Sequence, residues 1–334
     1  MIAVRPLPGR DNAPMTTPSV PQPSPNLPSN GCAQLSDWGV ARASGADAVT
    51  FLHSQLTHDV ALLGEGGARY AAFCNAQGRM LANMVLWKQG SEVWLAMPRS
   101  VMEATLKRLR MFVMRAKCTL EDLSDSVGVW GVWGDEASQH TSAVWTTAMV
   151  NDVTWVRLPD AHVHADTSAH AHTDTRAGVP RALVIAPEAP ASIDASAAQW
   201  AWLDVSAALP WVTPETVGQL VPQMVNMESL DGVSFKKGCY PGQEVVARSQ
   251  FRGAIKRRGE RVHSAQPMRA GDDVFAGDQA VGVVVNAEAS PRGGWDALVS
   301  MHLGQAEGQT LRAGAADGDI LQRWGLPYAL REDI

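Results

Sequence analysis

Strand-like and helical segments alternate over residues 35–118, and this alternation limits the fold classes that the chain can adopt. Two strand-like runs flank the turn in "YAAFCNAQGRMLANMVLW", and a third, "SEVWLAM", follows them. The helical segments are "GADAVTFLHSQL" and "SVMEATLKRLRMFVMRAK". No glycine-rich phosphate loop joins a strand to a helix, so the pattern predicts an α+β fold and not a nucleotide-binding parallel sheet.

Local signals indicate where both helices begin. In the first, apolar residues at helical spacing follow Asp47, which we expect to be the N-cap. The second opens with Ser100 and Glu103, which have the spacing of a capping box. Apolar residues at helical spacing, among them Leu106 and Leu109, then predict one buried face.

The two ends of the chain have different textures. Beyond Arg261, short apolar runs such as "AVGVVVNAEAS" and "DALVSMHL" are separated by Gly and Asp, which is typical of a small antiparallel barrel or sandwich. Residues 1–32 are instead proline-rich and polar, and this composition predicts a disordered tail. A chain of 334 residues is long enough for two or three domains between these ends.

Several classes of protein are disfavoured by what the sequence lacks. There is no run of about 18 apolar residues, so we expect no membrane span. The N-terminus has no export signal, which predicts a cytoplasmic location. Its cysteines, Cys32, Cys74, Cys118 and Cys239, include no CxxC pair, so neither disulfides nor a local zinc site is expected. Histidines recur in the tract 162–172; they could catch a transition metal, but we favour a loop insertion that binds none.

A basic segment lies within an acidic chain. Residues 236–261 contain eight Lys or Arg and two Glu, a charge of +6, within a total of −6. This contrast predicts an anionic ligand or partner, although a solvated surface has the same pattern. An RNA-binding module would combine more aromatic residues with these cations than Phe235, Tyr240 and Phe251, so direct binding of nucleic acid is not expected.

Cys239 occurs in this basic segment, in the stretch "SFKKGCYPGQE". Lys236 and Lys237 precede it, and neighbouring cations lower the pKa of a thiol by stabilising the thiolate. Gly238 and Gly242 allow the backbone to turn sharply and to approach a ligand closely. The motif favours an exposed, partly activated thiol, and an incidental cysteine in a basic turn is the alternative.

The same motif, read as "KGCYPGQE" after "GVSFK", resembles that of the YgfZ folate-binding proteins, relatives of the glycine-cleavage aminomethyltransferase or T-protein. "ARSQFRGAIKRR" and "FLHSQLTHDV" extend the resemblance, which covers roughly residues 35–330. It implies an α+β, three-domain aminomethyltransferase-like fold, with ferredoxin-like layers around a central folate pocket and a small C-terminal β-barrel. After the tail 1–32, the expected domains are a folate-binding α+β domain (33–125 with 195–250), a second α+β domain with the His-rich insertion (126–194), and the barrel (251–334).

The resemblance also implies site residues. Trp38 in "LSDWGV" and Trp200 in "QWAWLDV" fall where the family has folate-associated tryptophans, and Glu228 where relatives pair a carboxylate with the pterin edge. An indole offers a flat pterin stacking area and an N–H donor. Arg252 and Lys256 could meet the anionic glutamate tail. The functional thiol Cys239 would act with its motif residues Lys237, Gly238, Tyr240, Gly242, Gln243 and Glu244.

One departure bears on catalysis. In "FCNAQGRMLANMVLW", Ala82 and Asn83 stand where the T-protein stretch has two aspartates, one of them catalytic. Asn cannot accept a proton or stabilise a developing cation, so we expect no conventional enzyme. Among the histidines, only His53 and His263 are candidate bases for the thiol, and no catalytic triad is identifiable.

The function implied is therefore a protein that binds tetrahydrofolate or a one-carbon derivative of it. It would support iron–sulfur cluster assembly or repair, and thereby tRNA modification. Its expected partners are iron–sulfur proteins, including tRNA-modifying enzymes. The alternative is a folate-dependent transferase of one-carbon, aminomethyl-type groups that uses a different acid and base.

Overall fold

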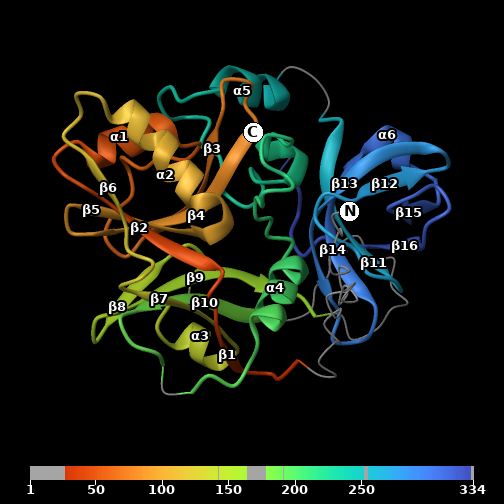
Figure 1. The fold of residues 1–334 in the computed structure, drawn as a ribbon, viewed down its shortest axis with the longest axis horizontal. Coiled ribbons are helices and arrows are strands. Elements are labelled where there is room, and N and C mark those ends of the chain that lie inside the picture. The colour runs from red at the N-terminus through yellow and green to blue at the C-terminus, as the bar shows by residue number, and fades with distance from the viewer. Residues whose placement is uncertain (1–26, 142, 164–177, 191, 252–254, 332–334) are drawn as a thin grey trace, which may run out of the picture.

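The computed structural model describes residues 27–141, 143–163, 178–190, 192–251 and 255–331. Two five-stranded sheets and a closed six-stranded barrel surround a central segment (Figure 1). Residues 1–26 of the predicted tail and residues 164–172 of the His-rich tract lie outside the described residues. All ladders between the strands of these sheets and the barrel are antiparallel, as expected for an α+β chain without a nucleotide-binding parallel sheet.

The first sheet has the strand order β3-β4-β5-β2-β6. Its strands are β2 (Trp38–Ser44), β3 (Ala68–Cys74), β4 (Met80–Gln89), β5 (Glu92–Pro98) and β6 (Thr119–Asp122). β3 and β4 form the predicted hairpin, and Gly78 in its turn has a φ of 72°, a conformation that glycine adopts readily.

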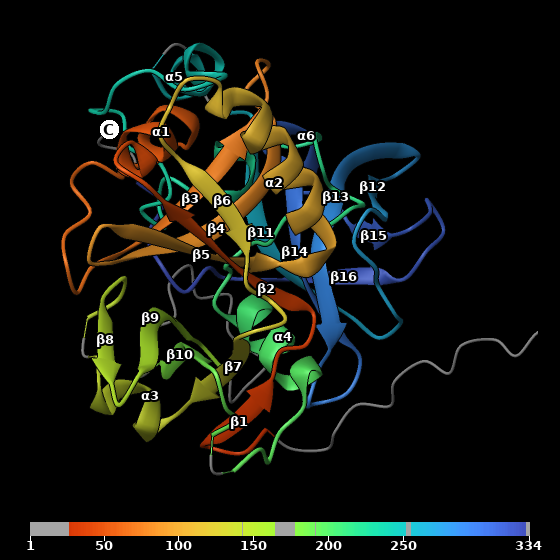
Figure 2. The same cartoon turned by 60° about the vertical axis from the view of Figure 1, so that its left-hand side comes forward.

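Helices α1 (Ala48–Gln55) and α2 (Arg99–Val113) cover one face of this sheet (Figure 2). Leu106 and Leu109 face the core, as predicted. Asp47 is the N-cap residue of α1, as predicted, whereas the cap predicted at Ser100 was wrong. The Asp47 side chain makes no cap hydrogen bond and accepts one from the Lys117 backbone N–H instead. α2 starts one residue before Ser100, directly after the strand that ends at Pro98, so Ser100 lies inside the helix.

The second sheet has the order β1-β7-β10-β9-β8. Its strands are β1 (Gly31–Gln34), β7 (Gly128–Trp133), β8 (Thr147–Val150), β9 (Val153–Ala161) and β10 (Val179–Ala186), and the short helix α3 is Asp135–Gln139. Gly31 and Cys32, which sequence alone assigns to the tail, therefore begin an edge strand. β1 pairs with β7, so the chain enters the second sheet before it forms the first.

The barrel predicted at the C-terminal end is present, with the order β11-β14-β13-β12-β15-β16. Its elements are β11 (Arg257–Ser264), β12 (Asp273–Ala276), β13 (Gln279–Ala289), β14 (Trp295–His302), α6 (Leu303–Ala306), β15 (Leu311–Ala313) and β16 (Ile320–Trp324). Within the described residues, no helix is long and apolar enough to cross a membrane.

A central segment joins the three sheets. It contains α4 (Ala197–Ser206), the 3-10 helix η1 (Pro222–Val225) and α5 (Gln243–Phe251). α4 lies between the second sheet and the barrel (Figure 1). The Trp202 indole in this helix donates a 2.6 Å hydrogen bond to Asp296 of β14. One hydrophobic core includes residues of both sheets, the central segment and the barrel, so the parts pack as one body.

Candidate functional site

The thiol motif forms the loop that leads into α5. Cys239 is exposed, whereas Cys32 and Cys74 are buried and Cys118 is half-buried. Burial raises the pKa of Cys32 to about 11 and that of Cys74 to about 12, so these two remain neutral thiols near pH 7. Cys239 is thus the accessible sulfur among the four, as the sequence predicted.

Lys237 holds this loop against α1. Its Nζ donates hydrogen bonds to the backbone oxygens of His53 and Leu56, which end that helix, and lies 4.6 Å from the centre of the Tyr240 ring. Burial lowers the pKa of Lys237 to about 8, an effect that the charges of Asp59 and Cys239 partly oppose. The ammonium is buried and caps helix carbonyls, a position that suits positive charge.

His53 lies beside the residue before the thiol. A Cβ placed on Gly238 would be 3.7 Å from His53 Nε2. His53 Nδ1 accepts a hydrogen bond from the Ala61 N–H and lies 3.2 Å from Asp59 Oδ1. The ring is therefore held by its Nδ1 side, with Nε2 toward the motif. Of the two candidate histidines, the structure brings His53 to the thiol loop; His263 is in the barrel, bonded to Asp296.

Gly242 allows the motif to touch the β3–β4 turn. Its φ is 80°, and a Cβ there would lie 2.4 Å from the Asn75 carbonyl oxygen and 2.6 Å from the Gly78 backbone. Only glycine fits this contact. Gln243 opens α5, and Glu244 forms an exposed ion pair with Arg248 one turn later.

Trp38 belongs to a chain of aromatic rings. It meets Trp211 edge to face, with ring centres 4.7 Å apart, and Trp211 meets Tyr70 in the same way at 5.4 Å. Tyr70 in turn stacks on Trp145 at 5.4 Å. We call these four rings the aromatic row. It connects the start of β2, the central segment, β3 and the loop before β8.

Trp200 lies elsewhere in the same core. Its ring packs on Gly131 of β7, and the Arg181 guanidinium lies 5.1 Å from its ring centre. Among the described residues it makes no ring contact with Trp38. Its indole N–H is buried without a hydrogen-bond partner among them. This is a donor that a bound polar group could satisfy.

Glu228 is fully buried in the loop after η1. Its Oε1 is paired with Arg258 of β11 and accepts a hydrogen bond from the Ser229 hydroxyl. Its Oε2 is buried and has no hydrogen-bond partner in the described part of the chain. A buried carboxylate oxygen without a donor is costly, so this atom indicates a place for a ligand N–H.

The Glu228 loop lies against the aromatic row. The Trp145 indole donates a 3.1 Å hydrogen bond to the Leu230 carbonyl, and a Cβ on Gly232 would approach Tyr70 to 3.0 Å. The chain then runs from this loop to the thiol. Along the way, the Gly232 carbonyl accepts a hydrogen bond from the Thr57 hydroxyl, and Lys237 Nζ donates one to the Leu56 carbonyl. The carboxylate and the sulfur therefore belong to one continuous segment that is pinned to the first sheet.

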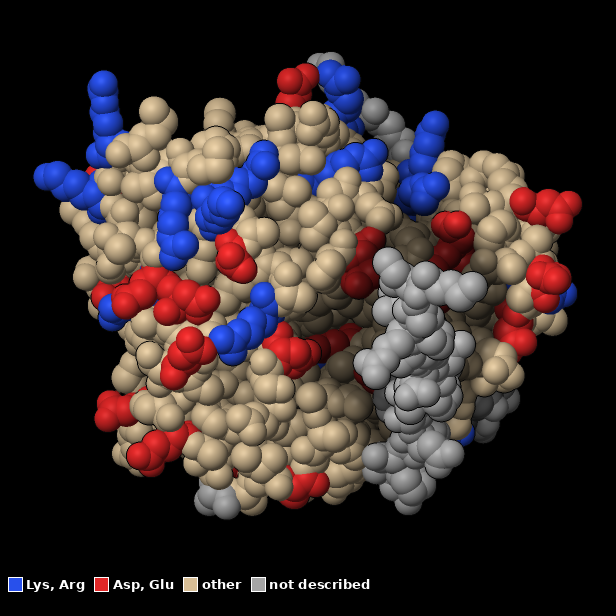
Figure 3. Space-filling view, in the orientation of Figure 1, with Lys and Arg blue, Asp and Glu red and all other residues tan. Residues whose placement is uncertain are grey.

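The basic segment is only partly a surface feature. Lys237, Arg258 and Arg261 are buried, and each bonds to internal oxygens. Lys256 is exposed, as a contact to an anionic tail requires, and Arg252 lies outside the described residues. Acidic side chains gather around the hollow between the sheets and the barrel, while Lys and Arg concentrate along the upper edge of this face (Figure 3).

Asn83 occupies a closed hydrogen-bond network. Its amide nitrogen donates to the Tyr70 hydroxyl at 2.6 Å and to the Pro210 carbonyl at 2.8 Å. Its oxygen accepts a 2.9 Å hydrogen bond from the Val212 N–H. The amide is thus used to join β4 to the central segment, which fits its predicted lack of a proton-transfer role.

Comparisons with known proteins agree with this geometry. Residues 29–171 match the family model "GCVT N-terminal domain". The structure resembles the glycine cleavage system aminomethyltransferase T from Bartonella henselae, with a TM-score of 0.65 and 17% identity over 90% of this chain and 86% of that one. At this identity, the likeness establishes an aminomethyltransferase-like fold, as expected.

Closer relatives decide the family. The chain is 34% identical over 274 residues to the tRNA-modifying protein YgfZ of Sodalis glossinidius, covering 77% of this chain and 79% of the relative. It is also 34% identical to the YgfZ of Cronobacter sakazakii over 72% of this chain and 73% of that protein. The chain belongs to the YgfZ family. The resemblance inferred from the cysteine motif is thereby confirmed.

Sequence reasoning did not name several residues that the structure places around these candidates. Trp211 and Trp145 join the aromatic row only through tertiary packing, and nothing in their local sequence distinguishes them from the other tryptophans. Arg258 was counted among surface cations, yet it is the partner of Glu228. Alternation along the strand could not have identified Arg258, because burial along β11 does not follow a period of two and Arg261 is buried as well.

Proposed function

We propose that this YgfZ-family chain binds tetrahydrofolate or a one-carbon derivative of it. In this role it supports the assembly or repair of iron–sulfur clusters, and thereby tRNA modification, through partners that include iron–sulfur enzymes acting on tRNA. The tRNA-modifying relatives support the last part of the proposal. The observation that carries the folate part is the unpaired, buried Oε2 of Glu228, in the loop whose Leu230 carbonyl accepts a hydrogen bond from Trp145 of the aromatic row.

The donor set suits a reduced pterin. The edge of a pterin presents adjacent N–H groups, and a carboxylate with one free oxygen can accept from them. Trp38 supplies an aromatic surface for the ring system, and the unpaired N–H of Trp200 can donate to a ligand carbonyl. Lys256, with Arg252, would pair with the glutamate tail. Bound folate would supply one-carbon chemistry; the residues named here bind and orient it.

The folate proposal is tested by calorimetric titration with tetrahydrofolate. We expect saturable heat for the wild type, and affinity weakened by about tenfold or more in Glu228→Gln and Trp38→Ala, since each loses a desolvated contact. Trp200→Ala should weaken binding as well. Glu103→Gln changes an exposed carboxylate on α2 and serves as the matched control. Absence of heat with every reduced folate would refute the proposal.

The thiol is proposed to act in the cellular role and not in holding folate. Cys239→Ala should abolish complementation of a strain that lacks the YgfZ protein, while folate affinity stays within a few-fold. Normal complementation would reduce Cys239 to a structural residue. Steady turnover of a methylene- or aminomethyl-folate that is lost in Asn83→Ala would favour the one-carbon transferase instead. A cytoplasmic location is part of the proposal, because an exposed free thiol persists in a reducing compartment.

A further inference from the structure

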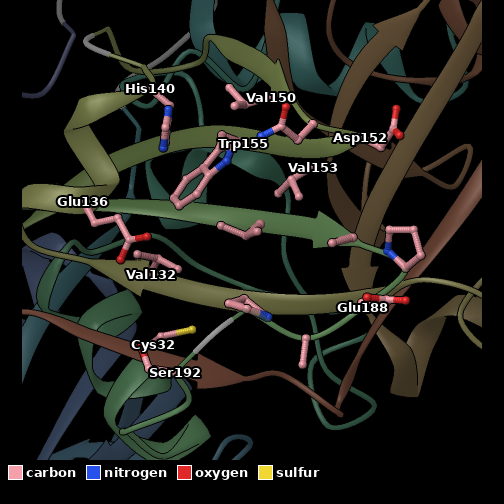
Figure 4. A pocket seen from close by; sticks show the side chains of 16 residues that line it. Cys32, Val132, Glu136, His140, Val150, Asp152, Val153, Trp155, Glu188 and Ser192 are labelled. Carbon is pink, nitrogen blue, oxygen red and sulfur yellow. The ribbon is translucent and has the colours of Figure 1, made fainter.

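A cavity of about 650 Å³ opens on the second sheet, on the face opposite to the one that packs against α4. Its floor is apolar and comes from neighbouring strands: Val132 of β7, Val153 and Trp155 of β9, and Val184 of β10 (Figure 4). The Trp155 ring lies 4.4 Å from that of His140, which follows α3. The site is separate from the aromatic row and from the thiol loop.

Carboxylates stand at both ends of this floor. Glu136 of α3 lies at the end near Cys32, while Asp152 and Glu188 lie toward the other end, on opposite sides of the floor (Figure 4). Asp152 is fixed by a tight two-residue turn between β8 and β9, in which Asn151 has a φ of 51° and Asp152 a φ of 63°. Asn and Asp tolerate this left-handed conformation, so the turn holds one carboxylate in place.

The lining favours cations. Its described residues include three carboxylates and no Lys or Arg, so the potential over the apolar floor is negative. Consistent with this, burial and the charges of Asp194 and Glu136 together raise the pKa of Cys32 to about 11. Cys32 is then a neutral thiol, and the described residues contain no group of three His, Cys, Asp or Glu placed to hold a metal ion. The complementary ligand is therefore an organic cation.

We propose that this cavity binds a linear aliphatic polyamine, with an ammonium group at each end and the methylene chain on the apolar floor. Glu136 receives one ammonium group and Glu188 the other, while Asp152 adds negative charge on the opposite side of the floor. The methylenes pack on Trp155 and the valines, as lysine stems do on apolar surfaces. Carboxylates at both ends of an apolar floor favour diamines over monoamines, because a monoamine can pair with a carboxylate at only one end. This goes beyond folate binding and needs none of its residues.

The test is a titration of the full-length protein with 1,7-diaminoheptane, 1,8-diaminooctane and n-octylamine, followed by calorimetry. We expect the two polyamines to bind at least about fivefold more tightly than the monoamine, since each exposed charge pair contributes about that factor. Glu136→Gln and Glu188→Gln should each weaken polyamine binding about fivefold, and the double variant about 25-fold, because the two ends are independent. Tetrahydrofolate affinity should not change in these variants.

Glu307→Gln is the matched control, because Glu307 is an exposed carboxylate on the barrel. An equal loss of polyamine affinity in Glu307→Gln and Glu136→Gln would mean that the acidic protein attracts cations in general, and it would overturn the proposal. So would monoamine binding as tight as that of the diamine. Trp155→Phe gives an independent check: it keeps the apolar floor, so polyamine affinity should remain within a few-fold.

Discussion

At the scale of single residues, the cysteine motif uses its two lysines differently. Lys236 is exposed, but Lys237 is buried and donates to the carbonyls that end α1. Adjacent identical residues in a loop are not distinguished by the sequence. The helix end next to them decides which one turns inward, because unpaired carbonyls there need donors.

Lys237 predicts a specific dependence of stability on pH. Its pKa is about 8 in the folded chain and near 10.5 when unfolded, chiefly because burial disfavours the charge. Between these values the unfolded state binds more protons, so this group makes the free energy of unfolding rise with pH. The free energy of unfolding of the wild type minus that of Lys237→Met, from urea titrations, should therefore rise from pH 8 to pH 10.5. A flat difference would contradict the buried charge.

At the scale of elements, the docking of the motif on the β3–β4 turn depends on Gly242. Ala at this position would have a φ of 80° and a Cβ 2.4 Å from a carbonyl oxygen, so we expect a loss of about 2 to 4 kcal/mol in the free energy of unfolding. Gly238→Ala is the control, because its Cβ would meet nothing closer than 3.7 Å. Urea unfolding of both variants measures this contrast. Equal losses would mean that the close approach is not what requires glycine.

Periodicity predicted the elements better than it predicted their ends. Leu106 and Leu109 identify the buried face of α2, because spacing along a helix is a local property. The cap at Ser100 failed since the preceding strand runs directly into the helix at Arg99. A capping box does occur at Ser196 in α4. Its spacing was visible in "SAAQ", so that cap was available from the sequence.

At the scale of the whole molecule, the fold class followed from the cysteine motif and the alternation of elements, but the site did not. The resemblance named Trp38 and Glu228 as candidates, but the contacts of Trp38 in the aromatic row and the free carboxylate oxygen of Glu228 result from packing between sheets, central segment and barrel. The net charge of the basic segment likewise overstated the positive charge at the surface, because the Arg258 and Arg261 side chains are buried. Which cations become internal depends on contacts far apart in the sequence.

The Glu228–Arg258 pair joins the loop after η1 to the barrel and predicts non-additive stability. Both side chains are buried, so removing either partner leaves the other charge uncompensated, at a cost of about 3 to 5 kcal/mol. Arg258→Met and Glu228→Gln should each lower the free energy of unfolding by about 3 to 5 kcal/mol. The double variant should lose less than the sum, because no unpaired charge remains. Guanidinium unfolding of the four proteins gives the coupling energy, and strictly additive losses would show that the pair does not connect loop and barrel.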